Sequence, residues 1–235
     1  SNRAGRFRIG PAGWSYPDWA GVVYPERRPR GFRPLSFIAS LFRVVEVNAS
    51  FYAIPTPRMT SGWPAQVPAD FRFTFKLTQM FTHERDGFPP TREVSAYKDG
   101  IRPIQQAGLL GPLLAQFPWS FRFTRENVAW LERIRDTFAE YERFIEVRHT
   151  SWLSEAGLDA IRRVGGFCNI DQPPHRDGLD RTAYLTSPMG YVRLHGRNTA
   201  EWFREGAGRD NRYNYLYSGE ELGFWVEKIR QMQVK

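Results

Sequence analysis

Cysteine and histidine are scarce in this sequence. Its 235 residues include one cysteine, Cys168, and four histidines. A single cysteine cannot form a disulfide within the chain, and neither a cysteine-rich zinc site nor a set of three zinc ions has enough ligands. One cysteine also fits a reducing compartment, so we predict a cytoplasmic protein.

Several other signals are missing. There is no run of 18 apolar residues and no basic segment followed by an apolar one, so we expect neither a membrane-spanning helix nor a signal peptide. The segment GPAGW lacks the GxGxxG spacing that opens a dinucleotide-binding helix, and no GxSxG motif of an acyl-transfer nucleophile is present. We therefore predict no nucleotide cofactor and no serine-type acyl transfer.

Positive charge is in excess. Lys and Arg total 33 against 25 Asp and Glu, which gives a formal net charge of +8. A positive field favours anionic partners such as nucleic acid, phosphorylated metabolites or acidic surfaces, although solubility alone would also explain it. The basic residues occur in runs of at most two, so they do not form a basic tail.

Segments with the two-residue period of strands alternate with segments of helical period. Strands are predicted at residues 6–14, 43–51, 71–78, 109–118, 143–152, 166–171 and 190–196. Helices are predicted at residues 34–42, 96–108, 124–141, 154–165 and 218–233, with Thr124 as an N-cap, a break near Pro103, and a capping box of Ser218 with Glu221. This alternation is typical of parallel strands joined by helices, and we predict one domain built as an open sheet or a closed barrel.

Polar side chains recur at the carboxyl ends of the predicted strands. In the fifth strand, Glu146 and Arg148 lie two residues apart and therefore on one face, whereas His149 points the other way. Buried parallel strands normally consist of Val, Ile and Leu, so such polar residues need partners. The residues concerned are Glu46, Asn48, Lys76, Thr78, Gln116, Glu146, Arg148, Asn169, Asp171, Arg193 and His195. A closed barrel explains them together, because the carboxyl ends of its strands surround one pocket.

Six ordered segments resemble the signature segments of a known family. They are GPAGWSYPDWAGVVYP, VVEVNASFYAIPT, FTFKLTQMFTH, LLAQFPWSF, IEVRHTSW and YVRLHGR. The family is domain-of-unknown-function family 72, the YecE-like proteins, and the resemblance runs from about Ile9 to about Ile229. It implies an α/β fold, a TIM-type (β/α) barrel, of which seven strands are seen here and the eighth unit is missing or truncated. The family has no established activity, and the likeness of such barrels to endonuclease IV and sugar isomerases suggests nucleic-acid or sugar-phosphate ligands by fold-level analogy.

We predict a ligand site at the carboxyl ends of the strands. Its catalytic residues are Glu46 or Glu146 as the base and His195 as the acid, because an imidazole titrates near neutral pH. The predicted ligand-binding residues are Trp14, Asn48, Tyr52, Lys76, His83, Gln116, Arg148, Trp152, Asp171 and Arg193. No metal cofactor is predicted, although a single Mg²⁺ or Mn²⁺ held by Glu46, Glu146 and Asp171 is an alternative. Purely structural ion pairs are the alternative to a ligand site.

Two functions remain open on the sequence. In the first, the protein is an enzyme in which Lys76, Arg148 and Arg193 hold the phosphate or carboxylate of a small molecule for acid/base chemistry. In the second, the barrel binds nucleic acid without catalysis, using surface arginines and aromatic side chains. The sequence predicts no oligomeric state.

Overall fold

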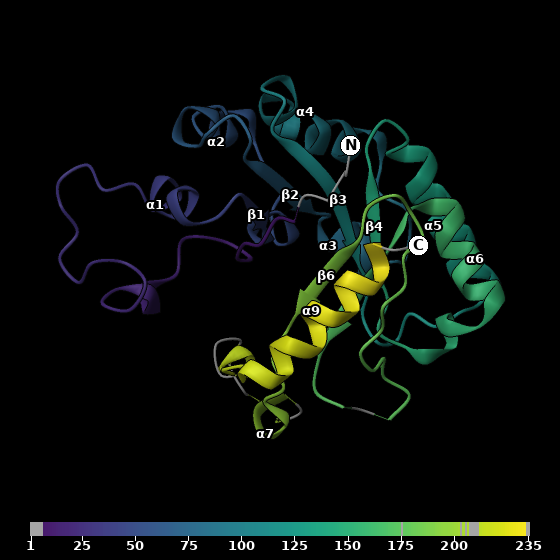
Figure 1. Cartoon of the computed structure of the whole chain (residues 1–235). Helices are drawn as coiled ribbons and strands as arrows, with labels where there is room; N and C mark the ends of the chain where they lie inside the picture. The colour runs from purple at the N-terminus through teal and green to yellow at the C-terminus, as the bar shows by residue number, and fades with distance from the viewer. Residues whose placement is uncertain (1–6, 175, 203, 205, 207–211, 234–235) are drawn as a thin grey trace, which may run out of the picture. The chain divides into compact units, whose positions relative to one another are not determined.

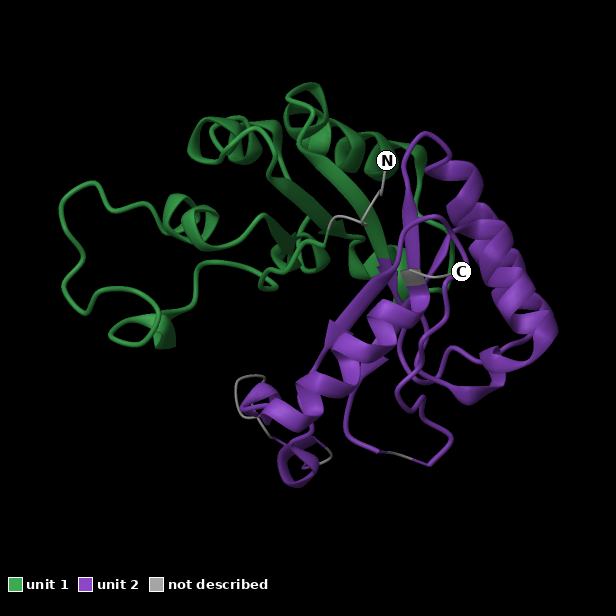
Figure 2. Cartoon of the chain, in the orientation of Figure 1, with its two compact units in different colours: residues 1–114 green, residues 115–235 purple. Residues whose placement is uncertain are grey.

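The computed structural model describes residues 7–174, 176–202, 204, 206 and 212–233 (Figure 1). The chain divides into two compact units, Ser1–Leu114 and Ala115–Lys235, which are coloured separately in Figure 2. The division falls inside strand β3 (Leu110–Gln116). The single domain expected from the sequence stays a prediction.

Unit 1 carries the strands β1 (Val44–Val47) and β2 (Arg72–Lys76) and the first part of β3. Its helical elements are η1 (Pro17–Trp19), α1 (Pro34–Leu41), η2 (Asn48–Phe51), α2 (Pro57–Thr60), η3 (Pro64–Gln66), α3 (Gln79–Thr82) and α4 (Thr91–Gln106). Phe73 and Phe75 alternate with polar residues in β2, are fully buried, and both stack against Trp63. The two-residue period of the sequence thus places one face of β2 in the core of unit 1.

Unit 2 carries the end of β3, together with β4 (Arg143–Glu146), β5 (Gly166–Asp171) and β6 (Tyr191–Leu194). Its helical elements are α5 (Arg125–Thr137), η4 (Thr150–Leu153), α6 (Glu155–Val164), α7 (Thr199–Trp202) and α9 (Gly219–Gln233). Figure 1 shows α5 and α6 side by side. Within the described part of the chain, no helix combines the length and the apolar character that a membrane span requires.

The predicted α/β class is correct, but the predicted seven-stranded barrel is wrong. The described residues form six strands, hydrogen-bonded in the order β1-β2-β3-β4-β5-β6, and the strand pairs within each unit run parallel. The segment predicted as the first strand contributes only an isolated bridge between Ala12 and Glu46. Pro11 in this segment has no N–H to donate, and a Cβ on Gly10 would lie 1.7 Å from the Val44 carbonyl oxygen. Arg6, at the start of the predicted strand, lies outside the described residues.

Side-chain hydrogen bonds cap the amino-terminal ends of α5, α6 and α9. The Thr124 hydroxyl accepts a hydrogen bond from the Asn127 amide, and Ser154 caps α6 in the same way. The capping box is confirmed, since Glu221 accepts from the Ser218 amide while Ser218 accepts from the Glu221 amide.

The break expected near Pro103 is absent, because α4 is continuous from Thr91 to Gln106. Pro103 lies in the last turns of this helix, where its missing N–H removes a single hydrogen bond and the bonds that follow persist. The Pro103 carbonyl still accepts from the Ala107 amide.

Candidate functional site

Strands β4, β5 and β6 place a set of polar side chains on one face of unit 2. Phe144 pairs with Gly166 and Ile170 pairs with Arg193 in the parallel register, and residues paired in this way share a face. Glu146, two residues after Phe144, therefore lies on the same face as Arg193. His195 follows Arg193 by two residues and continues the alternation.

Glu146 is the centre of an ion cluster, defined here as Glu146, Arg148, Arg193 and His195. Its side chain is 0% exposed. Oε1 accepts hydrogen bonds from Nε and Nη2 of Arg148, at 3.1 and 3.0 Å, and lies 3.2 Å from Nε2 of His195. Oε2 accepts from Nη1 of Arg193. Each carboxylate oxygen is therefore bonded to a guanidinium group.

The environment shifts the protonation of both central groups. Burial alone would raise the pKa of Glu146, but the opposing charges of Arg193, His195 and Arg148 together hold its pKa well below the ordinary value. Burial, helped by the positive charges of Arg193 and Arg148, lowers the pKa of His195 to about 4 against the opposing pull of Glu146. At neutral pH Glu146 is therefore ionised and His195 is neutral.

The charges of this cluster do not cancel. Counted over these four residues alone, one carboxylate faces two guanidinium groups and the neutral imidazole adds no charge, so the formal sum is +1. The exposed fraction of the side chains rises from 0% for Glu146 to 11% for Arg193 and 17% for Arg148. The two guanidinium groups therefore lie on the side of the cluster that reaches solvent.

Two aromatic rings lie beside the same side chains. The ring centroids of Trp202 and Tyr213 are 6.3 and 6.2 Å from that of His195, and the two rings meet edge to face at 5.5 Å. The Arg148 guanidinium lies 5.9 Å from the Trp202 centroid. Neither residue was among those predicted, because Trp202 and Tyr213 follow the last predicted polar strand end and carry no strand pattern.

Asp171 does not join this cluster, and its predicted ligand-binding role stays a prediction. It pairs with Leu194 in the register of β5 and β6, and so lies on the face opposite Arg193. There its carboxylate accepts two hydrogen bonds from Arg197, at 2.8 and 2.6 Å, and one from the Trp225 indole of α9, at 2.7 Å. Asp171 is thereby engaged in attaching α9.

Arg197 was missed by the sequence reasoning. It follows His195 by two residues, but β6 ends at Leu194 and Gly196 has φ +81°, so the alternation of the strand does not extend to Arg197. Besides Asp171 it binds Glu221, the capping-box residue of α9, at 3.1 Å. Glu221 also accepts from the Tyr215 hydroxyl at 2.6 Å. These bonds attach the segment after β6 to α9 and so fix the backbone that carries His195.

Trp152 and Gln116 are both buried, and the side chain of each donates a hydrogen bond to a backbone carbonyl. Trp152 is 0% exposed, stacks on Phe121, and donates its indole N–H to the Phe121 carbonyl at 2.7 Å. This position makes Trp152 part of the core of unit 2, and its ligand-binding role stays a prediction. The Gln116 amide is buried and donates to the Phe117 carbonyl at 2.7 Å.

The remaining predicted residues lie in unit 1. Glu46 and Lys76 are buried at 7% and 8% exposure, on one face of β1 and β2, and the Lys76 ammonium sits 3.9 Å from the Phe51 ring centroid. His83 packs on the same ring at 4.8 Å. The other three predicted residues are Tyr52, which is 60% exposed, Trp14, which packs on Trp63, and Asn48, whose buried Oδ1 has no hydrogen-bond partner among the described residues.

No group of three or more His, Cys, Asp or Glu side chains that could hold a metal ion occurs among the residues that the structure describes.

The fold and the site define an α/β protein of parallel strands with a buried cluster of charges at the strand ends. The chain belongs to the family described as "Protein of unknown function DUF72", which matches residues 8–235. The resemblance found in the six sequence segments is therefore confirmed.

Two curated proteins are similar to this chain in sequence. The UPF0759 protein YunF of Bacillus subtilis is 30% identical over 239 residues, which cover 96% of this chain and 83% of the relative. The UPF0759 protein YecE of Escherichia coli K12 is 25% identical over 187 residues. That match covers 80% of this chain and 62% of the relative.

Solved structures agree on the fold. A DUF72 family protein from Thermotoga maritima is 34% identical with a TM-score of 0.82, over 96% of this chain and 86% of the other. A DUF72 family protein from Enterococcus faecalis is 26% identical with the same TM-score of 0.82, over 96% and 84%.

Proposed function

We propose that this protein is an enzyme that binds a small carboxylate- or phosphate-bearing compound at the ion cluster and acts on it by acid/base chemistry. One observation carries the proposal: the cluster holds two guanidinium groups against one carboxylate, with a neutral imidazole beside them. The two guanidinium groups lie partly buried, where an anion gains more from a positive charge than at an exposed surface. The guanidinium fork of Arg148 matches the geometry of a carboxylate or a phosphate.

The pKa shifts reassign the roles within this proposal. Glu146 has a pKa well below its ordinary value and is bonded to both arginines, so it is a weak base at neutral pH and acts as a positioning residue. His195 is neutral, so it donates a hydrogen bond or takes up a proton, whereas an imidazolium acid would need a higher pKa. Arg193 and Arg148 hold the anion.

A bound anion would also tune His195. The positive charges of Arg193 and Arg148 lower the pKa of this imidazole. A negative charge placed beside the two arginines would therefore raise the pKa of His195 towards 7. Binding of the substrate would thereby bring the pKa of His195 into the range in which proton transfer is effective.

Ligand binding tests the proposal directly. Native mass spectrometry of the purified protein identifies retained compounds, and a panel of carboxylates and phosphates is titrated calorimetrically. Arg148→Gln should weaken binding about 10- to 100-fold, because a charge-assisted hydrogen bond contributes about 1.5–3 kcal/mol. The matched control is Arg163→Gln, which removes the same charge from an exposed position on α6 and should leave binding unchanged.

The imidazole provides an independent readout. NMR titration of the His195 ring should give a pKa near 4 without ligand and a higher value with saturating ligand. No retained or titrated anion, or equal effects of Arg148→Gln and Arg163→Gln, would show that the cluster is a structural ion network.

A further inference from the structure

Unit 1 contains an arginine-rich segment that the ion cluster does not involve. Residues 22–33, named here the arginine loop, follow η1 and lead into α1 (Figure 1). They contain Arg27, Arg28, Arg30 and Arg33 but no lysine, and their single acidic residue is Glu26. Three net positive charges are therefore concentrated in twelve residues of a chain whose formal net charge is +8.

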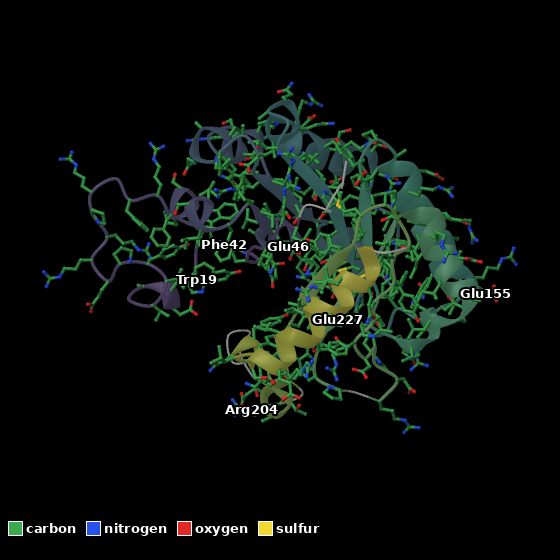
Figure 3. All side chains as sticks on the ribbon, viewed as in Figure 1. Trp19, Phe42, Glu46, Glu155, Arg204 and Glu227 are labelled. Atoms are coloured by element: carbon green, nitrogen blue, oxygen red, sulfur yellow. The ribbon has the colours of Figure 1, made fainter. Side chains whose placement is uncertain are left out.

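The four arginines are presented to solvent. All four residues are exposed, and none forms an ion pair with a carboxylate among the residues that the structure describes. Figure 3 shows nitrogen-tipped side chains projecting from the segment that follows the labelled Trp19. Clustered like charges raise each other's free energy unless an anion lies nearby, so this surface favours a polyanionic partner.

An aromatic base holds the loop in place. Tyr24 is only 2% exposed and packs against Phe32 and Phe37, with ring centroids 5.5 and 5.4 Å away. Arg28 lies over both Tyr24 and Phe32, at 5.3 and 5.9 Å from their centroids. The chain turns between Arg28 and Phe32 at Gly31, which has φ +82°, a conformation that residues with a Cβ rarely adopt. The loop is thus anchored by side-chain packing, which lowers the entropy lost when it binds.

We propose that the arginine loop binds single-stranded nucleic acid through its phosphates. Guanidinium groups bind phosphate in a bidentate fashion. Surfaces that bind single strands combine such cations with aromatic rings that meet the bases, and in this loop the half-buried Phe32 beside Arg28 is the ring available for this, since Tyr24 is buried. A membrane surface fits less well, because Val22 is the only large apolar side chain of the loop that is extensively exposed. This surface is additional to the proposed anion site of unit 2 and does not depend on it.

Salt dependence gives the expected magnitude. Each phosphate neutralised on a single strand contributes about −0.7 to the slope of log K against log salt. Four arginine contacts predict a slope of about −3, so binding weakens roughly 50-fold between 50 and 200 mM salt.

The test measures fluorescence anisotropy of a labelled 20-nucleotide dT strand across a salt series. The variant Arg27→Gln/Arg30→Gln/Arg33→Gln leaves Arg28 on its aromatic base and should reduce the slope by about 2. The matched control, Arg92→Gln/Arg125→Gln/Arg163→Gln, removes the same charge from exposed helical positions and should keep the slope. Protection of Arg27, Arg30 and Arg33 from phenylglyoxal by the dT strand, on the unsubstituted protein, repeats the test without relying on a variant's folding.

Four results would overturn the proposal. They are affinity no better than millimolar at 50 mM salt, an equal loss in the control variant, no arginine protection, and tighter binding to phosphatidylserine vesicles or to duplex DNA than to the single strand. The first three would show that the loop's charge serves solubility. The fourth would assign the loop to another anionic surface.

Discussion

Substitution of Glu146 by glutamine removes the single negative charge of the ion cluster and nearly preserves the shape of the side chain. In the folded protein, Arg148 and Arg193 would then face an amide that satisfies at most part of their hydrogen bonding. Both guanidinium groups are largely withdrawn from water, with exposed fractions of 17% and 11%. Glu146→Gln therefore leaves two positive charges in a poorly hydrated place.

The expected loss is about 3–5 kcal/mol in the free energy of unfolding, the range found when one partner of a buried ion pair is removed. Urea denaturation at pH 7 measures it, because Glu146 is fully ionised there and contributes its whole interaction. Glu142→Gln is the control: Glu142 is exposed and also follows α5, so its replacement should change stability by less than about 0.5 kcal/mol.

A double substitution shows whether Glu146→Gln destabilises the protein by leaving a charge unpaired or by disturbing side-chain packing. Glu146→Gln combined with Arg193→Met should be less destabilised than the sum of the two single changes, because the second removes a charge that the first left unpaired. A loss below about 1 kcal/mol for Glu146→Gln, or additive losses in the double substitution, would refute the assignment of Glu146 as the residue that holds the cluster together.

Three further predictions concern the same unit. The free energy of unfolding should fall by about 3 kcal/mol as pH drops from 6.5 to about 4, because the unfolded chain protonates its histidine before the folded His195 does, and His195→Gln should remove that part of the pH dependence in urea titrations. Arg197→Ala should cost about 3 kcal/mol or more by leaving Asp171 without its guanidinium partner, and a cost like that of an exposed arginine would contradict the α9 attachment. Gly196→Ala should destabilise by at least 1 kcal/mol in thermal unfolding, because Gly196 has φ +81° and a Cβ would lie 2.8 Å from the Tyr215 Cβ; an unchanged melting temperature would contradict this.

Features that depend on residues close together in the chain could be predicted from the sequence. Thr124 and the Ser218–Glu221 pair cap their helices as predicted, since a cap depends on groups three residues apart. Glu146 and Arg148 were predicted to share a face, and their side chains are hydrogen-bonded. The family resemblance was likewise contained in short contiguous segments.

The tertiary structure decided which charges meet. Alternation along β5 puts Asn169 and Asp171 on one face, but it does not say whether that face is the one that carries Glu146 or the one that packs on α9. Register between strands settles the matter, and it places Asp171 with Arg197 and Trp225. Register is set by packing and hydrogen bonds between segments far apart in the chain, which a local pattern does not contain.

The same reason explains the strand that was wrongly predicted and the burial of Trp152. Residues 6–14 have the composition of a strand, yet Gly10 and Pro11 meet the backbone of β1 in a way that allows only a bridge. Trp152 was predicted to bind a ligand because it follows a strand, and the segment after β4 places it in the core beside Phe121. The sequence by itself determined the order of the six strands and of helices α1, α4, α5, α6 and α9 between and after them, two of the helix caps, and the excess of positive charge. The pairing of Glu146 with Arg193, 47 residues away, depended on the packing of the strands in unit 2.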